Sequence, residues 1–334
     1  MCSGGQAPPF NYPLLMAVWK VAPALATGNT VVLKPSSNTP LTALLLAEVA
    51  SEVLPDGLIN VVCGDRQALS ALLPHPVPRQ LGATASTESG IAIAGASLAH
   101  VKRLHLGLTG KAPALVLADA DLDAVTETLC TAAFLNAGQD CTAASRVLVE
   151  NSVHDELVQR LTARAATVFT GPPSDTTAFY GPLNSSRQRD GILSYLHDLP
   201  SHQHILTGGK APDRPGWFLQ PTIVAGVRAG DDLCHKELFG PVMSIERFDD
   251  LYEAVHRLNS SPYGLACSVH TSHHATAMKA AASLDYGCVW VNTHLPLVSE
   301  MPHSGHKQSG FGYDLSTLAL DEYTRAKHIM HRIA

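Results

Sequence analysis

Cys141 is the residue in this chain whose type and setting best suit covalent chemistry. It lies in a polar loop at 136–145, between an apolar helical run at 122–135 and an apolar strand at 146–150. A thiol held on a loop between two rigid elements is a plausible nucleophile toward a carbonyl carbon. The alternative interpretation is a small hydrophobe buried in a helix-to-strand turn. At an ordinary pKa of about 8.5 little of the thiol is ionised at neutral pH, so backbone amides of the loop would have to stabilise the thiolate.

The elements around this loop alternate between short apolar strands and helices, which is typical of a parallel sheet with helices on both faces. We therefore predict an α/β fold. Thr39 is a suitable N-cap with Pro40 at the first helical position. The predicted strands are 30–33, 58–62, 80–83, 103–106, 114–117, 146–150 and 288–292. The predicted helices are 40–54, 67–73, 91–100, 122–135, 154–168, 251–258 and 275–284.

Composition bounds the class of protein. A chain of 334 residues with 46% hydrophobic and 16% charged residues can bury a large core and predicts two globular domains. A net charge of −6 and the lack of a Lys/Arg-rich block give no footprint for nucleic acid. No apolar run reaches the roughly 18 residues that cross a bilayer, and the N-terminus lacks an export signal pattern. We expect a chain that binds neither nucleic acid nor membrane.

The cysteines and histidines predict no metal centre. Seven cysteines are an odd number, widely spread and without a CxxC pair, which favours free thiols in a reducing cytoplasm over a zinc site or disulfide framework. Seventeen histidines are scattered along the chain. The clusters His202 with His204, and His270 with His273 and His274, are interpreted as solvated loop residues.

Several motifs share one order along the chain. They are Pro9-Phe-Asn11-Tyr-Pro13, Gly28-Asn-Thr-Val-Val-Leu-Lys34-Pro-Ser36, Asn136-Ala-Gly-Gln-Asp-Cys141, Lys236-Glu237-Leu-Phe239-Gly-Pro241, Val289-Trp-Val-Asn292 and Gly305-His-Lys-Gln-Ser-Gly-Phe-Gly312. Together they resemble the aldehyde dehydrogenase superfamily over essentially the whole chain, and most closely its NAD-dependent, aminoaldehyde and betaine-aldehyde branch.

The resemblance implies a Rossmann-type parallel-sheet cofactor domain at 1–110 and an α/β catalytic thiol domain at 111–308. A C-terminal tail at 309–334 would return to the cofactor domain and to an oligomer interface, so we expect a homodimer. Family members carry a long segment before the Asn11 motif, whereas Met1 stands just ahead of it here. If the chain starts there, we expect exposed apolar surface on the first sheet and helices, or a partner covering that face.

The resemblance also assigns roles. Cys141 would attack an aldehyde, and the Asn11 side-chain amide would stabilise the resulting oxyanion; otherwise Asn11 is a turn former. For NAD or NADP, Lys34 and Ser36 would bind the adenosine ribose. Ser86 would meet the pyrophosphate at a helix N-terminus. Glu237 would hold the nicotinamide ribose and Phe239 would place its ring, although Lys34 and Glu237 are also consistent with solvated surface charges.

The sequence departs from the family pattern at four places. Gly107 stands where the family has the Glu that activates water, and glycine cannot move a proton. Ser37 replaces a Glu that grips ribose hydroxyls, and Ala85 adds a methyl where backbone should approach phosphate. The segment His303-Ser304-Gly305-His306 is more polar than the family's substrate-tunnel wall.

Four functions are compatible with this combination. The first is an aldehyde dehydrogenase whose acyl-enzyme hydrolyses slowly. The second passes the Cys141 acyl group to another nucleophile, and the third uses Cys141 and Asn11 for non-redox thiol catalysis on an acyl thioester without NAD. The fourth is a non-catalytic scaffold. Retention of Cys141, Asn11, Lys34 and Glu237 favours catalysis, and we place aldehyde oxidation first.

Overall fold

The computed structural model describes residues 3–333, which divide into two compact units. Unit 1 runs to Gly107 and takes in the segments Leu297–Ser304 and from Phe311 onward. Unit 2 comprises Leu108–Pro296 and Gly305–Gly310. The functional domains predicted at 1–110, 111–308 and 309–334 stay predictions. Over the described residues, every helix is too short or too polar to cross a membrane.

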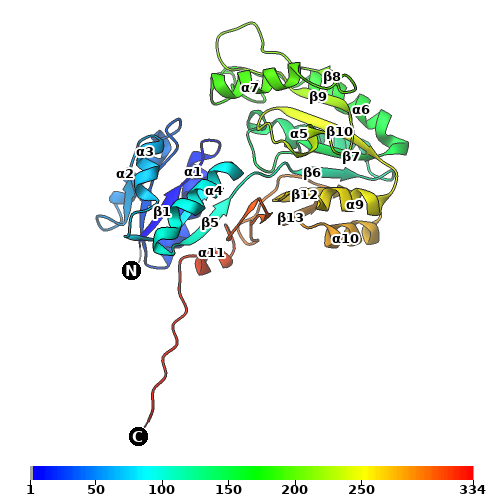
Figure 1. Cartoon of the computed structure of the whole chain (residues 1–334). Coiled ribbons are helices and arrows are strands. Elements are labelled where there is room, and N and C mark those ends of the chain that lie inside the picture. The colour runs from blue at the N-terminus through cyan, green and yellow to red at the C-terminus, as the bar shows by residue number, and fades with distance from the viewer. Residues whose placement is uncertain (1–2, 334) are drawn as a thin grey trace. The chain divides into compact units, whose positions relative to one another are not determined.

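Unit 1 is built on a doubly wound sheet (Figure 1). Its strand order is β15-β5-β4-β1-β2-β3, and the five strands from β1 to β5 pair in parallel. The order 3-2-1-4-5 of these strands is the Rossmann order, whose direction reverses between β1 and β4. The bounds are β1 Ser3–Ala7, β2 Thr30–Leu33, β3 Ile59–Val61, β4 Pro78–Thr84, β5 Arg103–Gly107 and β15 Gly310–Phe311.

The helices of unit 1 connect these strands. They are α1 Pro13–Ala26, α2 Leu41–Ser51, α3 Arg66–Leu72, α4 Thr87–Ser97, the 3-10 helix η1 Leu98–His100 and α11 Leu318–Asp321. Helix α1 was not predicted, because its sequence is apolar on every side and contains Pro23, which hides the helical period. The predicted cap of α2 is wrong: the helix begins at Leu41, Pro40 occupies the N-cap position, and no side chain caps it.

Helix α2 leaves an apolar face in solvent. Leu41, Leu45 and Val49 on the helix and Val53 just after it are all exposed. Only Ala43 of the helix is buried, where it joins the small core of α1 and β2.

A buried ion cluster ties the last part of the chain to α1. The Lys20 Nζ donates to both carboxylate oxygens of Asp314, at 2.8 and 2.7 Å. His105 Nε2 lies 3.2 Å from the Lys20 Nζ and 3.4 Å from the Asp314 carboxylate. Beyond Tyr323 the described chain forms neither helix nor strand and is exposed through Ile333. The dimer-forming strand expected in this tail stays a prediction.

Unit 2 contains a seven-stranded sheet of order β13-β12-β6-β7-β10-β9-β8, parallel except for the β8–β9 pair. The bounds are β6 Pro113–Val116, β7 Arg146–Glu150, β8 His204–Thr207, β9 Thr222–Val227, β10 Val242–Phe248, β12 Ala266–His270 and β13 Cys288–Val291. A small antiparallel pair, β11 Tyr263–Gly264 with β14 His306–Lys307, lies apart from it.

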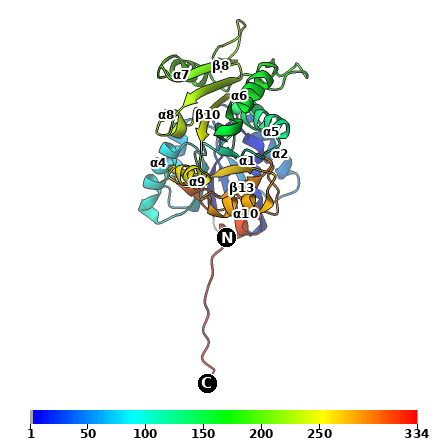
Figure 2. The ribbon, with the colours of Figure 1, turned by 90° about the vertical axis from the view of Figure 1, so that its right-hand side faces the viewer.

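Helices cover both faces of this sheet. Helices α5 Leu122–Phe134 and α6 Asn151–Ala166 lie side by side (Figure 2) and pack with Val147 and Val149 of β7. The neighbouring Leu148 points instead into a second core with α9 Leu251–Asn259 and α10 His274–Ser283. Strands buried on both faces in this way support the predicted α/β class. Helices α7 Ser186–His197 and α8 Asp232–His235 complete the unit.

Candidate active site

The loop that carries Cys141 is backbone-strained. Helix α5 ends at Phe134 and continues into a 3-10 turn, η2 Leu135–Gly138. Asn136 and Ala137 have left-handed φ values of 52° and 57° there, and Gly138 follows at 66°. Consecutive non-glycine residues in this region cost free energy, and such strain clusters at functional sites. The chain then turns through Cys141, which is half-buried and forms no disulfide with any cysteine that the structure describes.

Two glycines allow the rest of unit 2 to close on this loop. A Cβ at Gly138 would lie 2.3 Å from the carbonyl oxygen of Gly240, and one at Gly110 would lie 1.7 Å from the carbonyl oxygen of Cys141. Neither contact is possible for a residue with a side chain, because both neighbours are backbone atoms. The backbone of the Cys141 loop therefore lies directly against Gly110 and against the Gly240–Pro241 peptide.

Glu237 lies in the same cluster as Cys141. Its Oε1 accepts hydrogen bonds from the backbone N–H groups of Gly110 and Lys111, each at 3.0 Å. Burial raises the pKa of the Glu237 carboxyl, and the two amides oppose that shift. Glu237 is half-buried, and these two amides hold its carboxylate in place. Because Gly110 touches both the Glu237 carboxylate and the Cys141 carbonyl, it joins these two predicted site residues.

Phe239 follows in a left-handed conformation, with φ 52°. Its carbonyl and that of Leu238 accept from the Gln188 side-chain amide, at 3.1 and 2.7 Å. Helix α7 therefore fixes the backbone on either side of the Phe239 ring. Neither this helix nor Gln188 was predicted from the sequence, since α7 is mostly polar and only Ile192 and Leu196 are buried.

Lys111 is a further buried group at this site that sequence reasoning missed. Its Nζ donates to the Ser145 carbonyl at 3.2 Å, and burial lowers the pKa of its ammonium to about 8. A lysine between glycine and a buried strand gives no signal of burial in the sequence. It supplies a positive charge beside the Cys141 loop, which stabilises anionic groups there.

The other predicted residues follow the carboxyl ends of the parallel strands of unit 1. Asn11 comes after β1, Lys34 and Ser36 after β2, Ser86 after β4, and Gly107 ends β5. Carboxyl ends of parallel strands meet at one edge of a sheet, and ligands of doubly wound sheets bind there, where the strand order reverses. Lys34, Ser36 and Ser86 therefore directly follow β2 and β4, the two strands on either side of β1.

Local hydrogen bonds hold the polar side chains at this edge of the sheet. Lys34 is buried, its Nζ donates to the Pro35 carbonyl at 2.9 Å, and burial lowers the pKa of its ammonium. Ser86 is the exposed N-cap of α4 and accepts from the Ser89 N–H at 3.3 Å. The Ser36 hydroxyl accepts from the Asn38 N–H at 3.4 Å. A cation, hydroxyls and a helix N-terminus fit the anionic pyrophosphate and ribose of a dinucleotide.

Three of the departures from the family pattern, Ser37, Ala85 and Gly107, lie at the same edge. Gly107 has no side chain, and a Cβ added to it would lie 3.3 Å from the Thr84 Oγ1. Ser37 is exposed, and the Ala85 N–H donates to the Gly107 carbonyl at 3.0 Å. In the segment 303–306, His303 is buried, and His306 is exposed and pairs with Asp285 at 3.0 Å.

One histidine assignment needs correction. His270 is buried on β12 rather than solvated, and burial lowers the pKa of its imidazole to about 3. His202 bonds to the Asp231 carboxylate at 2.9 Å. Over residues 3–333, no three His, Cys, Asp or Glu side chains gather in a group able to hold a metal ion.

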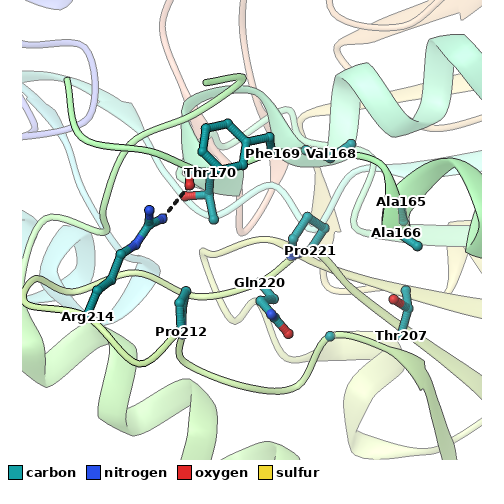
Figure 3. Close-up of a pocket in the computed structure, with 11 residues that line it drawn as sticks. Ala165, Ala166, Val168, Phe169, Thr170, Thr207, Pro212, Arg214, Gln220 and Pro221 are labelled. Atoms are coloured by element: carbon teal, nitrogen blue, oxygen red, sulfur yellow. Dashed lines mark hydrogen bonds between the residues drawn. The ribbon is translucent and has the colours of Figure 1, made fainter. Parts of the chain in front are cut away.

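A separate cavity of about 300 Å³ lies in unit 2, near the end of α6 (Figure 3). Arg214 lines it, donates to the Thr170 carbonyl, and stacks its guanidinium 3.9 Å above the Phe218 ring. None of the predicted catalytic or cofactor residues lines this cavity.

The fold and site thus combine a Rossmann-type sheet with an α/β unit that carries a strained thiol loop. The chain belongs to the aldehyde dehydrogenase family, whose profile matches residues 4–329. It is 41% identical over 329 residues to the mitochondrial aldehyde dehydrogenase of Leishmania tarentolae, covering 97% of this chain and 66% of that relative. It is 40% identical over 327 residues to the phenylacetaldehyde dehydrogenase of Pseudomonas fluorescens, covering 96% and 65%.

The solved structures agree. The betaine aldehyde dehydrogenase of Staphylococcus aureus in complex with NAD+ superposes with a TM-score of 0.96 at 36% identity, over 98% of this chain and 66% of that one. The predicted family and fold are confirmed. The chain spans about two thirds of the length of these relatives.

Proposed function

We propose that this chain oxidises aldehydes with NAD or NADP through a covalent intermediate on Cys141. The strained Cys141 loop, closed by Gly110 and Gly138 against the Glu237 segment, carries this proposal. Family membership and the NAD+ complex of the Staphylococcus aureus relative support it. Those relatives' names include betaine aldehyde and phenylacetaldehyde dehydrogenases, so both aldehydes belong in a substrate panel.

In the proposed reaction, the Cys141 thiolate adds to the carbonyl carbon and forms a thiohemiacetal, whose oxyanion accepts from the Asn11 amide. NAD(P) supplies a hydride acceptor, so loss of hydride from that carbon leaves a thioester on Cys141. Lys34, Ser36 and Ser86 are the donors for the adenosine side of the cofactor. Glu237 and Phe239 serve its nicotinamide side.

The fate of the thioester distinguishes two candidates. With glycine at position 107, the chain lacks the base that would deprotonate the attacking water. Loss of a general base typically slows the affected step, here hydrolysis of the thioester, about 10²–10⁴-fold. The first candidate is therefore slow hydrolysis. The second, favoured by the same glycine, is transfer of the acyl group to a thiol or amine, which needs less help from a base than water does. A non-redox thiol catalyst or a scaffold remains the outcome if NAD does not bind.

Burst kinetics test the proposal. Wild-type protein is mixed with NAD or NADP and each aldehyde, and NADH or NADPH is followed by absorbance at millisecond resolution. We expect a burst of about one equivalent of reduced cofactor per chain, followed by a slow steady state. If the protein transfers the acyl group to another nucleophile, an added thiol or amine should accelerate only the slow phase. Cys141→Ala should abolish the burst, whereas the control Cys288→Ala should retain it. Lack of a burst with every aldehyde, despite bound cofactor, would refute the proposal.

We also propose a homodimer, with the tail from Tyr323 onward and the apolar face of α2 as candidate contact surfaces. A cytoplasmic location remains the expectation from cysteine usage. Light scattering of the purified chain checks the assembly: a mass of two chains supports the dimer, and a mass of one chain contradicts it. Removal of residues 325–334 should then yield the monomer if the tail forms the interface.

A further inference from the structure

A buried chain of hydrogen bonds runs from strand β12 to the backbone next to Cys141. The His270 Nε2 lies 3.0 Å from the Ser268 hydroxyl, and the same hydroxyl lies 2.8 Å from the His294 Nδ1. The His294 Nε2 lies 2.8 Å from the carbonyl oxygen of Thr142. Ser268, His270 and His294 are 0%, 2% and 4% exposed, so water does not compete for these contacts.

Only one placement of the hydrogens satisfies this chain. A carbonyl can only accept, so the His294 Nε2 must carry hydrogen. Burial lowers the pKa of the His294 imidazole to about 4, so the ring is neutral at pH 7 and its Nδ1 is an acceptor. The Ser268 hydroxyl then donates to that Nδ1. Its oxygen accepts in turn from the His270 Nε2–H, since His270 is neutral as well.

The segment that carries His294 is itself fixed. The Asn292 side chain accepts from the Thr271 N–H and donates to the Thr271 carbonyl, both at 2.9 Å. The Trp290 indole donates to the Pro296 carbonyl at 2.8 Å, and its ring packs on the His294 imidazole with centroids 4.8 Å apart. These contacts hold the donor in place on both sides of His294.

At the other end, Thr142 has further contacts. Its N–H and hydroxyl both bond to the Asp140 carboxylate, at 2.7 and 2.8 Å. The preceding carbonyl, that of Cys141, lies against Gly110. The contact with His294 therefore fixes the Thr142–Ala143 peptide. The contacts of Asp140 and Gly110 fix the Cys141–Thr142 peptide before it, and together they hold the backbone whose Cα–Cβ bond carries the thiol.

We infer that His294 is a positioning residue for Cys141, which acts through a neutral Nε2–H donated to the Thr142 carbonyl. The inference rests on the proposed role of Cys141 as nucleophile. Small displacements of a reacting group are costly, and a shift of about 1 Å can reduce turnover about a hundredfold. Loss of this donor should therefore slow reactions of the Cys141 sulfur without removing any group that touches substrate.

Two amide variants distinguish the contact made by the His294 Nε2 from the contact made by its Nδ1. In His294→Gln the amide nitrogen lies near the former Nε2 and can still donate to Thr142. In His294→Asn the shorter side chain reaches only the former Nδ1 position, so Ser268 keeps a partner and Thr142 loses its donor. Iodoacetamide labelling of Cys141, read by peptide mass spectrometry on folded protein, requires neither NAD nor aldehyde.

We expect His294→Asn to label at least about tenfold more slowly than wild type and His294→Gln to stay within about threefold. Equal rates in all three proteins, or equal slowing in both variants, would overturn the inference. If His294→Asn does not fold, Ser268→Ala replaces it. That variant removes the group that holds the tautomer, and labelling at the wild-type rate would overturn the inference.

A nitrogen-15 NMR measurement on histidine-labelled wild-type protein reads the tautomer directly. We expect neutral His294 with hydrogen on Nε2 at pH 7; hydrogen on Nδ1, or an imidazolium, would overturn the inference. Because both readouts omit cofactor, a protein that produces no NADH but shows the predicted labelling order refutes the proposed function alone.

Discussion

Replacing Gly107 with glutamate should convert a single turnover into sustained aldehyde oxidation. Gly107 ends strand β5, at the sheet edge that also carries the predicted cofactor residues. The family resemblance places a water-activating Glu at this position. The variant restores a carboxylate without altering any residue that the proposed chemistry uses.

The structure indicates how the Gly107→Glu substitution should affect the stability of the fold. A Cβ at Gly107 lies 3.3 Å from the Thr84 Oγ1 and 3.8 Å from its Cγ2, so Thr84 must move by a few tenths of an ångström. Gly107 does not have a left-handed φ. A side chain in place of glycine within a strand gains about 0.5–1 kcal/mol from reduced backbone freedom. We therefore expect little net change in stability, against a gain of about 10²–10⁴-fold in the hydrolytic step.

Steady-state NADH production after the burst measures this gain. The matched control is Gly107→Gln, which has the same size and strand propensity but cannot accept a proton. Glutamate should accelerate the slow phase and leave the burst amplitude near one equivalent. Glutamine should leave the slow phase at the wild-type rate. Equal slow phases in wild type, Gly107→Glu and Gly107→Gln would show that the missing base does not limit turnover.

Three further predictions concern the cofactor edge, the oxyanion and the buried ion cluster. Ser37→Glu should tighten NAD binding about tenfold relative to Ser37→Gln in calorimetry, because a carboxylate gains charge-assisted hydrogen bonds to ribose worth about 1.5 kcal/mol; equal affinities would contradict this role. Asn11→Ala should reduce the burst rate about 10²–10³-fold while NAD affinity is unchanged, as expected for a lost oxyanion donor, and an unchanged burst rate would exclude Asn11. Burial alone would raise the pKa of Asp314, but Lys20 and His105 hold it well below its usual range. Asp314 therefore contributes stability above the unfolded pKa near 3.9, and this contribution is lost as pH falls through the lower folded pKa. In urea unfolding at pH 7, Asp314→Asn should lower the free energy of unfolding by about 3–5 kcal/mol, whereas the exposed control Asp190→Asn should lower it by less than about 1 kcal/mol. The difference between the two variants should become smaller in acid. Equal losses of unfolding free energy would refute the assigned role of the cluster.

Much of the fold could be predicted because most elements obey simple rules. The strands 30–33 and 146–150 match β2 and β7 residue for residue, since both are short apolar runs bounded by polar turns. The missed strand β10 contains Glu246 and Arg247, and β12 ends at His270. The buried Glu246 carboxylate accepts two hydrogen bonds from the Arg146 side chain, at 2.6 and 3.1 Å. The residues next to Glu246 in sequence give no sign of this pairing.

The site was predictable in part for a similar reason. Cys141 and Glu237 were identified from local motifs, but the link between them through the Gly110 backbone spans 127 positions of sequence. His294 was missed because a single histidine after a strand is usually solvated, and its partners Ser268 and Thr142 lie far from it in sequence. Contacts made by backbone atoms leave little trace in residue types.

The central claim is that Cys141 becomes acylated during aldehyde oxidation. Intact-protein mass spectrometry, on samples quenched in acid just after the NADH burst, tests it most directly when followed by peptide mapping. We predict one added acyl group per chain, located on Cys141, that appears only when aldehyde and NAD or NADP are both present. A burst without an adduct on Cys141, or an adduct that forms equally well without cofactor, would contradict the account.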